Sequence, residues 1–385
     1  MEQVIKIFIA LVSSEICKKP VRPEILRMIT PDIMEEVYNM SKSHDLVHVV
    51  AVALKKHKLL GRDRISQKYV KHLHSALVRY EALAFEESRI YKVFEKKKIV
   101  YVPLKGSVIR KFYAEPWMRT SCDIDILVQE EELERAKDAL VSSLGYVVGR
   151  YKYHDISMYS PEGMLVELHF RIVENEKNMD KVLKKVWSYS VPKKEGSFRY
   201  KMTPEYLLFH AYAHMLYHFA HGGCGVRYVM DIWLLENELV YDEKIFWKLC
   251  KESKMDSFVM NVRKLAKVWF EDEKIDELGR RLEAYIITGG VFGNLETKIT
   301  ARKTQTKGHY RYLLQRIFIP YKEFCASYPL LEKLPFLYPY FTVKRWLKIF
   351  NKKIAKNAVQ EIRLNRTILQ DDVDDLKQLF KELKL

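Results

Sequence analysis

The sequence has 385 residues, 48% hydrophobic and 30% charged, which is a globular composition and excludes a wholly disordered chain. Its 66 Lys and Arg residues exceed its 50 Asp and Glu residues, so the formal net charge of +16 favours an anionic partner without identifying it. The absence of an apolar run of about eighteen residues excludes a transmembrane helix.

The chain begins with an apolar segment whose hydrophobic residues recur at helical spacing. No basic residue precedes Lys6 and no small-residue cleavage site follows, so we expect an amphipathic helix rather than a signal peptide. The five cysteines are scattered and form no C-x-x-C pair, which is typical of a reducing compartment and argues against a cysteine zinc site. Together these features predict a cytoplasmic protein.

The elements fall into four regions in chain order, and the whole is predicted as an α+β fold. Residues 1–98 are expected to be a helical N-terminal region, ending in a long helix from Gln67 to Lys98. Residues 99–175 form a small mixed-sheet core, with short β-rich runs around one amphipathic helix that stops at Gly145. Residues 176–300 are predicted as a helical domain that completes the cleft, and 301–385 as a basic, aromatic-rich helical region.

A pair of aspartates in the second β-rich run gives the first indication of chemistry. Asp123 and Asp125 are two residues apart, so on a strand they share a face while Ile124 and Ile126 point into a core. Two adjacent carboxylates repel each other unless a cation lies between them, and hard oxygen ligands suit Mg²⁺. Glu167, on a later strand, would bring a third carboxylate to the same place.

A Gly-Ser pair lies where the first strand ends and a helix begins. Gly106 allows close backbone approach, and the N–H groups at the start of a helix favour an anion near Ser107. Lys105 and Arg119 add positive charge, and they either contact phosphate or pair with the aspartates when no metal is bound. His169 shares a strand face with Glu167 and is either a packed histidine or a site residue.

These motifs in this order resemble the DNA polymerase β-like nucleotidyltransferase superfamily. More narrowly, they resemble its uncharacterised bacterial nucleotidyltransferase family, whose pattern is carried by four segments. The segments are Leu104-Lys105-Gly106, Pro116-x-x-Arg119, the run from Asp123 to Val128, and Val166-Glu167-Leu168-His169. The 17-residue gap from Gly106 to Asp123 exceeds the spacing common in the superfamily but fits the narrower family, and it leaves the placement of Arg119 open.

The resemblance implies a mechanism and a set of site residues. Asp123, Asp125 and Glu167 would be the catalytic residues that hold two Mg²⁺ ions, with Mn²⁺ as the alternative metal. Gly106 and Ser107 would cradle the β and γ phosphates of an NTP, with Lys105, Arg119 and His169 completing the nucleotide site. An acceptor hydroxyl would attack the α-phosphorus and release pyrophosphate.

Three further features lie outside these motifs. His210, His214 and His218 share one helical face, which we interpret as a helix packed on the catalytic sheet rather than a metal site. Arg227 and Asp231 are four residues apart and are expected to form an ion pair on a helix face. The basic stretch 344–366 suits an anionic partner, either RNA or a membrane surface, or a solvated helix.

The predicted function is therefore a metal-dependent nucleotidyltransferase whose acceptor is a small molecule, an RNA or a protein. One alternative is a toxin-like nucleotidyltransferase that modifies RNA or a protein side chain. The other is a catalytically silent basic module that uses the same fold to bind RNA or protein.

Overall fold

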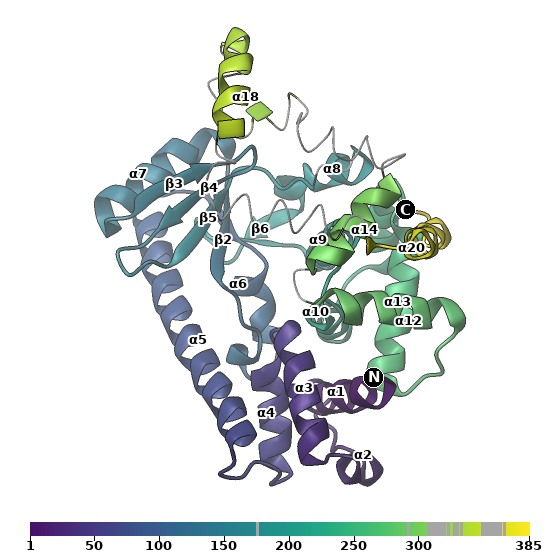
Figure 1. Cartoon of the computed structure of the whole chain (residues 1–385). Helices are drawn as coiled ribbons and strands as arrows, with labels where there is room; N and C mark the ends of the chain where they lie inside the picture. The colour runs from purple at the N-terminus through teal and green to yellow at the C-terminus, as the bar shows by residue number, and fades with distance from the viewer. Residues whose placement is uncertain are drawn as a thin grey trace.

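The computed structural model describes residues 1–174, 177–290, 293–305, 321, 324–325, 331, 334–347, 364 and 367–385. It is an α+β fold in which one five-stranded mixed sheet is surrounded by helices, as predicted (Figure 1). Most of the basic stretch 344–366 lies outside the described residues, so its predicted role is not addressed by the structure. None of the helices in the described part of the chain combines the length and apolar character needed to cross a bilayer.

The N-terminal region is helical, as predicted. Thr30 and Asp63 cap two of its helices, since their side chains accept hydrogen bonds from first-turn N–H groups. The long helix begins three residues earlier than expected and ends two residues earlier. The helices are α1 (Glu2–Ile16), α2 (Pro23–Arg27), α3 (Pro31–Ser43), α4 (Val47–Lys56) and α5 (Arg64–Lys96).

The sheet has the strand order β1-β2-β5-β4-β3, and only β2 and β5 run parallel. Because β5 lies beside β2, the register places Asp125 directly opposite Glu167. The strands are β1 (Tyr101–Pro103), β2 (Asp123–Val128), β3 (Val147–Tyr151), β4 (Asp155–Tyr159) and β5 (Leu165–His169).

The two faces of the sheet have opposite character. Ile124 and Ile126 are fully buried on one face, as predicted, and they pack with apolar residues of α5 and of α7 (Leu133–Leu144). Strand residues alternate between faces, so the polar residues of β2, β4 and β5 gather on the opposite face. Figure 1 shows α5 and α7 on one side of the sheet and α9 (Pro204–Ala220) on the other.

The chain between β5 and α9 is only partly helical, although residues 176–300 are predicted to be helical. It contains α8 (Lys177–Leu183) and then a two-stranded hairpin of β6 (Ser190–Pro192) and β7 (Tyr200–Met202). Each strand has three residues, too few to show a period of two. The hairpin lies against the edge strand β1, where Tyr101 N donates to the Phe198 carbonyl at 3.0 Å.

Short helices complete the sheet region, and longer helices follow α9. Thr203 occupies the expected N-cap position of α9, but its side chain makes no capping hydrogen bond. The short helices are α6 (Gly106–Ile109) and the 3₁₀ helices Arg110–Phe112, Pro116–Met118, Glu130–Glu132, Val186–Tyr189 and Pro335–Leu337. The later helices are α10 (Val226–Glu238), α11 (Glu243–Glu252), α12 (Asp256–Glu271), α13 (Glu277–Gly289), α14 (Leu295–Gln305), α18 (Tyr338–Leu347) and α20 (Gln370–Glu382).

A buried ion pair joins the sheet region to these later helices. Arg119, in the segment before β2, donates to both carboxylate oxygens of Asp231 on α10, from Nε at 3.2 Å and from Nη2 at 2.9 Å. The Tyr113 hydroxyl donates to the same carboxylate at 2.6 Å. The expected pair of Arg227 with Asp231 is wrong, because the ion pair of Arg227 is with Asp45, at 3.4 Å. Sequence spacing identified both residues but not their partners across the fold.

We predict that Asp231→Ala lowers the free energy of unfolding by about 3–5 kcal/mol, because it leaves a buried guanidinium unpaired. Urea denaturation followed by circular dichroism measures this. The matched control is Glu252→Ala, which removes an exposed pair with Lys185 at 2.7 Å and should lower stability by less than about 1 kcal/mol. Equal losses in the two variants would contradict the assigned role of Asp231.

Candidate active site

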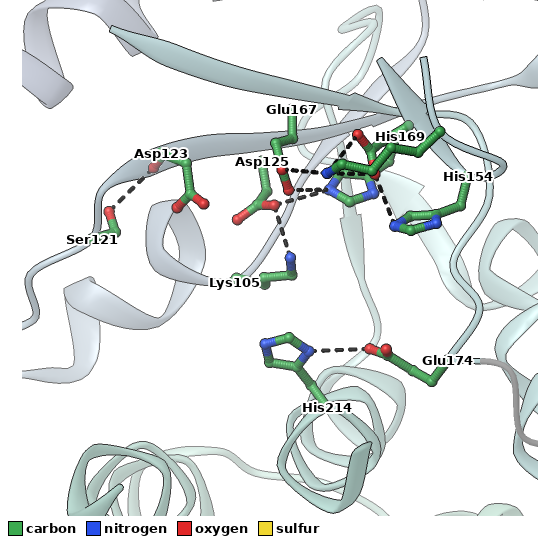
Figure 2. A network of polar contacts seen from close by, with 11 residues as sticks. Lys105, Ser121, Asp123, Asp125, His154, Glu167, His169, Glu174 and His214 are labelled. Carbon is green, nitrogen blue, oxygen red and sulfur yellow. Dashed lines mark hydrogen bonds and ion pairs between the residues drawn. The ribbon is translucent and has the colours of Figure 1, made fainter. Parts of the chain in front are cut away.

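Two adjacent strands present carboxylates on the polar face of the sheet. Asp123 and Asp125 both project from β2 to the same side, and Glu167 projects beside them from β5 (Figure 2). Donor atoms of Asp125, Glu167 and His169 all lie within 4.8 Å of one another. Asp123 lies outside this group of three, two residues earlier on β2. The structure thus brings together four of the eight predicted site residues on one face.

Asp125 is the most enclosed of these carboxylates. Its Oδ1 accepts a hydrogen bond from Lys105 Nζ at 2.8 Å and lies 2.9 Å from His169 Nε2. Burial alone would raise the pKa of Asp125, but the Lys105 ammonium and the His169 ring hold it well below its usual range. The pair of Lys105 with an aspartate, one of the two roles foreseen for this lysine, is therefore observed.

Asp123 is in the opposite electrostatic situation. Within the described residues its carboxylate has no hydrogen-bond or ion-pair partner, and only its backbone carbonyl accepts a bond, from Ser121 Oγ at 3.2 Å. Burial and the neighbouring Asp125 carboxylate raise the pKa of Asp123 to about 6. A carboxylate in this position gains more from a bound cation than one that is already neutralised.

Glu167 and the next strand extend the polar cluster. Lys152 Nζ lies 2.8 Å from Glu167 Oε1 and 3.1 Å from Asp155 Oδ1, so it neutralises two acids at once. His154 Nε2 lies 2.8 Å from the fully buried carboxylate of Asp155, and its ring stacks on that of His169 with centroids 5.7 Å apart. Sequence reasoning missed Lys152, His154 and Asp155, although Asp155 pairs with His169 in the register of β4 and β5.

Lys105 has an unusual backbone conformation. Its φ of 43° and ψ of −116° are those of the first central residue of a type II′ turn, a position that favours glycine. Ser107 N donates to the Leu104 carbonyl at 3.2 Å, which closes the turn. Such a conformation in a residue with a side chain costs about 1–3 kcal/mol and persists where the surroundings hold it. Here the bond to Asp125 is one contact that holds it.

Gly106 and Ser107 follow this turn and begin α6. A Cβ at Gly106 would meet Arg119 Nη1 and Ser121 Oγ at 3.1 Å, so a larger residue would require these side chains to shift by a few tenths of an ångström. The Ser107 hydroxyl donates to Glu87 Oε1 on α5 at 2.7 Å, so in this state its side chain is engaged on the α5 side. Arg119 is likewise engaged with Asp231, and neither foreseen role of Arg119 is seen in the structure.

The histidine face of α9 packs opposite the carboxylates, as interpreted from the sequence. His210, His214 and His218 line a cavity of about 350 Å³ together with Lys105, Glu167 and His169. His214 Nδ1 lies 3.1 Å from Glu174 Oε1, a partner that the sequence did not indicate (Figure 2). Burial lowers the pKa of His210 to about 3 and that of His218 to about 2, so this wall of the cavity is uncharged at neutral pH.

The donor set suits a hard divalent cation. Carboxylate oxygens are the preferred ligands of Mg²⁺ and Mn²⁺. Asp125 and Glu167 supply them from neighbouring strands, and Asp123 adds another within the same strand face. The nitrogen of His169 within the group is a ligand that Mn²⁺ accepts more readily than Mg²⁺. The residues present therefore fit the metals that the sequence predicts.

The fold and this face together are typical of one class of protein, the nucleotidyltransferases. The chain matches the family described as uncharacterised nucleotidyltransferase over residues 31–271, which is more than half of its length. The protein therefore belongs to that family, as the sequence motifs predict. A search of curated proteins and a search of solved structures each gave no match.

The strained turn at Lys105 leads to a prediction. Lys105→Ala and Lys105→Gly both remove the bond to Asp125, but only glycine relieves the backbone, so the glycine variant should be more stable by about 1 kcal/mol. Urea denaturation compares the two. Lys152 is the control, because its φ is not positive. There the alanine variant should be at least as stable as the glycine variant. If the alanine variant were at least as stable as the glycine variant at both positions, strain at Lys105 would be refuted.

Proposed function

We propose that this protein transfers a nucleoside monophosphate from an NTP to an acceptor hydroxyl and releases pyrophosphate. Membership of the nucleotidyltransferase family supports this class of reaction. The observation that carries the proposal is the convergence of Asp125 and Glu167 from two strands, with Asp123 beside them and no partner for it in the described part of the chain.

Asp123, Asp125 and Glu167 are the residues proposed to hold Mg²⁺, with Mn²⁺ as the alternative. When bound, a divalent cation neutralises the phosphates and lowers the pKa of an acceptor hydroxyl. The residues around it position these ligands. His169 fixes Asp125 and Lys152 fixes Glu167, so each carboxylate is oriented by a hydrogen bond before substrate enters.

Lys105 is proposed to contact the phosphates of the NTP. Its ammonium neutralises Asp125 in the metal-free protein, and its side chain borders the cavity in front of the sheet. A lysine that is released from a carboxylate can bind phosphate with the same charge-assisted hydrogen bond. The uncharged histidines of α9 form the opposite wall and limit the access of water to the carboxylates.

The main test is labelled-NTP transfer to components of a cell extract, together with calorimetry of each NTP in the presence of Mg²⁺. We expect Asp123→Asn/Asp125→Asn to abolish transfer and to remove the metal-dependent part of NTP binding. The matched control is Asp138→Asn/Glu134→Gln on α7, which removes two acids from the helix on the other side of the sheet and should leave both unchanged.

Two outcomes would count against the proposal. Metal-dependent NTP binding that persists in the double aspartate variant would place the metal elsewhere. Absence of both binding and transfer in the wild-type protein, with every NTP, would favour a catalytically silent binding module on the same fold.

The raised pKa of Asp123 predicts how metal affinity depends on pH. Because the cation must displace a proton from a carboxylate with a pKa of about 6, Mg²⁺ affinity should rise about tenfold between about pH 5 and pH 7 and then level off. Calorimetry across this range measures it. In Asp123→Asn the residual affinity should lack this rise, and an unchanged profile would exclude Asp123 as the titrating ligand.

A further inference from the structure

A second cavity, of about 360 Å³, adjoins the candidate active site. It lies between the end of β1, α6, the β6–β7 hairpin and the first turn of α9. Leu104 and Lys105, in the strained turn, line both this cavity and the one in front of the carboxylates. Ser107, whose hydroxyl is bonded to Glu87, also lines the second cavity.

The residues around this cavity carry five positive charges and no negative charge. Besides Lys105, they are Lys111, Lys193, Arg199 and Lys201, which we call the basic pocket. No ion pair to these four occurs among the residues that the structure describes, whereas Lys105 is paired with Asp125. Burial and the charges of Lys201, Lys193 and Arg199 lower the pKa of Lys111. These cations repel one another, and an anion would relieve that repulsion.

The basic pocket is built on fixed elements. Glu95, at the end of α5, accepts hydrogen bonds from Ser197 Oγ at 2.8 Å and from Arg199 N at 2.9 Å, and so anchors the hairpin. The Arg199 guanidinium lies over the ring of Tyr91, 4.5 Å from its centroid. The arginine is thereby held in place without a carboxylate, and its N–H groups remain available to a ligand.

One residue that lines this cavity has a buried hydroxyl without a partner. Thr203 Oγ1 is inaccessible to solvent and makes no hydrogen bond with any described residue, although Thr203 precedes the first turn of α9. A buried hydroxyl without a partner is unfavourable. The N-terminus of this 17-residue helix carries a partial positive charge that adds to that of the lysines. Apolar residues such as Val108, Leu207 and Leu239 form the remainder of the wall.

We propose that the basic pocket binds a phosphate group of a small organic substrate, with the apolar wall contacting the organic part. Two sources have this chemistry: the triphosphate of the donor NTP and a phosphate carried by the acceptor. Phosphate binding depends on the pocket alone, whereas the choice between these sources rests on the proposed function.

The test is calorimetric titration of the full-length protein with inorganic pyrophosphate in EDTA, without metal or acceptor. We expect binding that weakens at least tenfold in Lys193→Ala/Lys201→Ala, which removes two exposed side chains. Thr203→Val, which keeps the volume of the side chain, should weaken binding by a smaller factor. The control Lys251→Ala/Lys264→Ala removes two exposed charges from α11 and α12 and should bind as the wild type does.

Equal pyrophosphate affinity in the pocket variant and the wild type, or no binding to the wild type, would overturn the proposal. This outcome is separate from a failure of the proposed function, because Asp123→Asn/Asp125→Asn should retain pyrophosphate binding in EDTA. Absence of transfer by the wild-type protein, with intact pyrophosphate binding, would refute only the proposed reaction.

Titration with an NTP and Mg²⁺ then identifies the source of the phosphate. If the pocket holds the triphosphate of the donor, pyrophosphate competes with the NTP and Lys193→Ala/Lys201→Ala weakens NTP binding. If it holds a phosphate of the acceptor, NTP affinity is unchanged in that variant and pyrophosphate binds to the NTP-loaded protein. Either result supports the basic pocket as a phosphate site.

Discussion

The parallel pairing of β2 with β5 places two carboxylates side by side, and much of the surrounding structure offsets the repulsion between them. Asp125 and Glu167 are opposite each other in the register, on a face that helix α9 partly covers. Without a metal, Lys105 neutralises Asp125, whose carboxylate also lies 2.9 Å from His169 Nε2, and Lys152 neutralises Glu167. Asp123 has no such partner in the described structure, and burial together with the Asp125 charge raises its pKa. A bound cation would neutralise the carboxylate charge that the protein side chains do not.

The helices that precede the sheet in the chain and the helices that follow it pack into one apolar core. Buried residues of α1 and α4 cluster with those of α9, α10 and α12, while the core between the sheet, α5 and α7 is separate. The polar face of the sheet therefore faces α9, and the apolar core to which α9 belongs contains residues from both ends of the family-matched segment 31–271. The Arg119–Asp231 pair fixes the loop before β2 to that core. In this way α10, more than 100 residues further along the chain, helps to fix the position of β2 and of its neighbour β5.

Local pattern predicted the sheet core well because its signals are local. The alternation around Asp123 and Asp125 defines a strand face, and Gly145 adopts the left-handed conformation that ends α7. Partners across the fold were not predictable in the same way. Arg119 pairs with a residue 112 positions away, and Glu174 meets His214 across 40 positions, distances at which spacing carries no information. The hairpin at 190–202 was missed because three-residue strands show no periodicity.

The turn at Lys105 has one ammonium group and borders two cavities. While that group bonds to Asp125 it contributes its charge mainly to the carboxylates, and a ligand in the basic pocket that attracted it would leave Asp125 less neutralised. If a ligand in one cavity drew that ammonium group away, the free energy of occupying the other cavity would change, and by the same amount in both directions. Two ligands bound there would both contact the short segment Leu104-Lys105, and a single ammonium group would be divided between them.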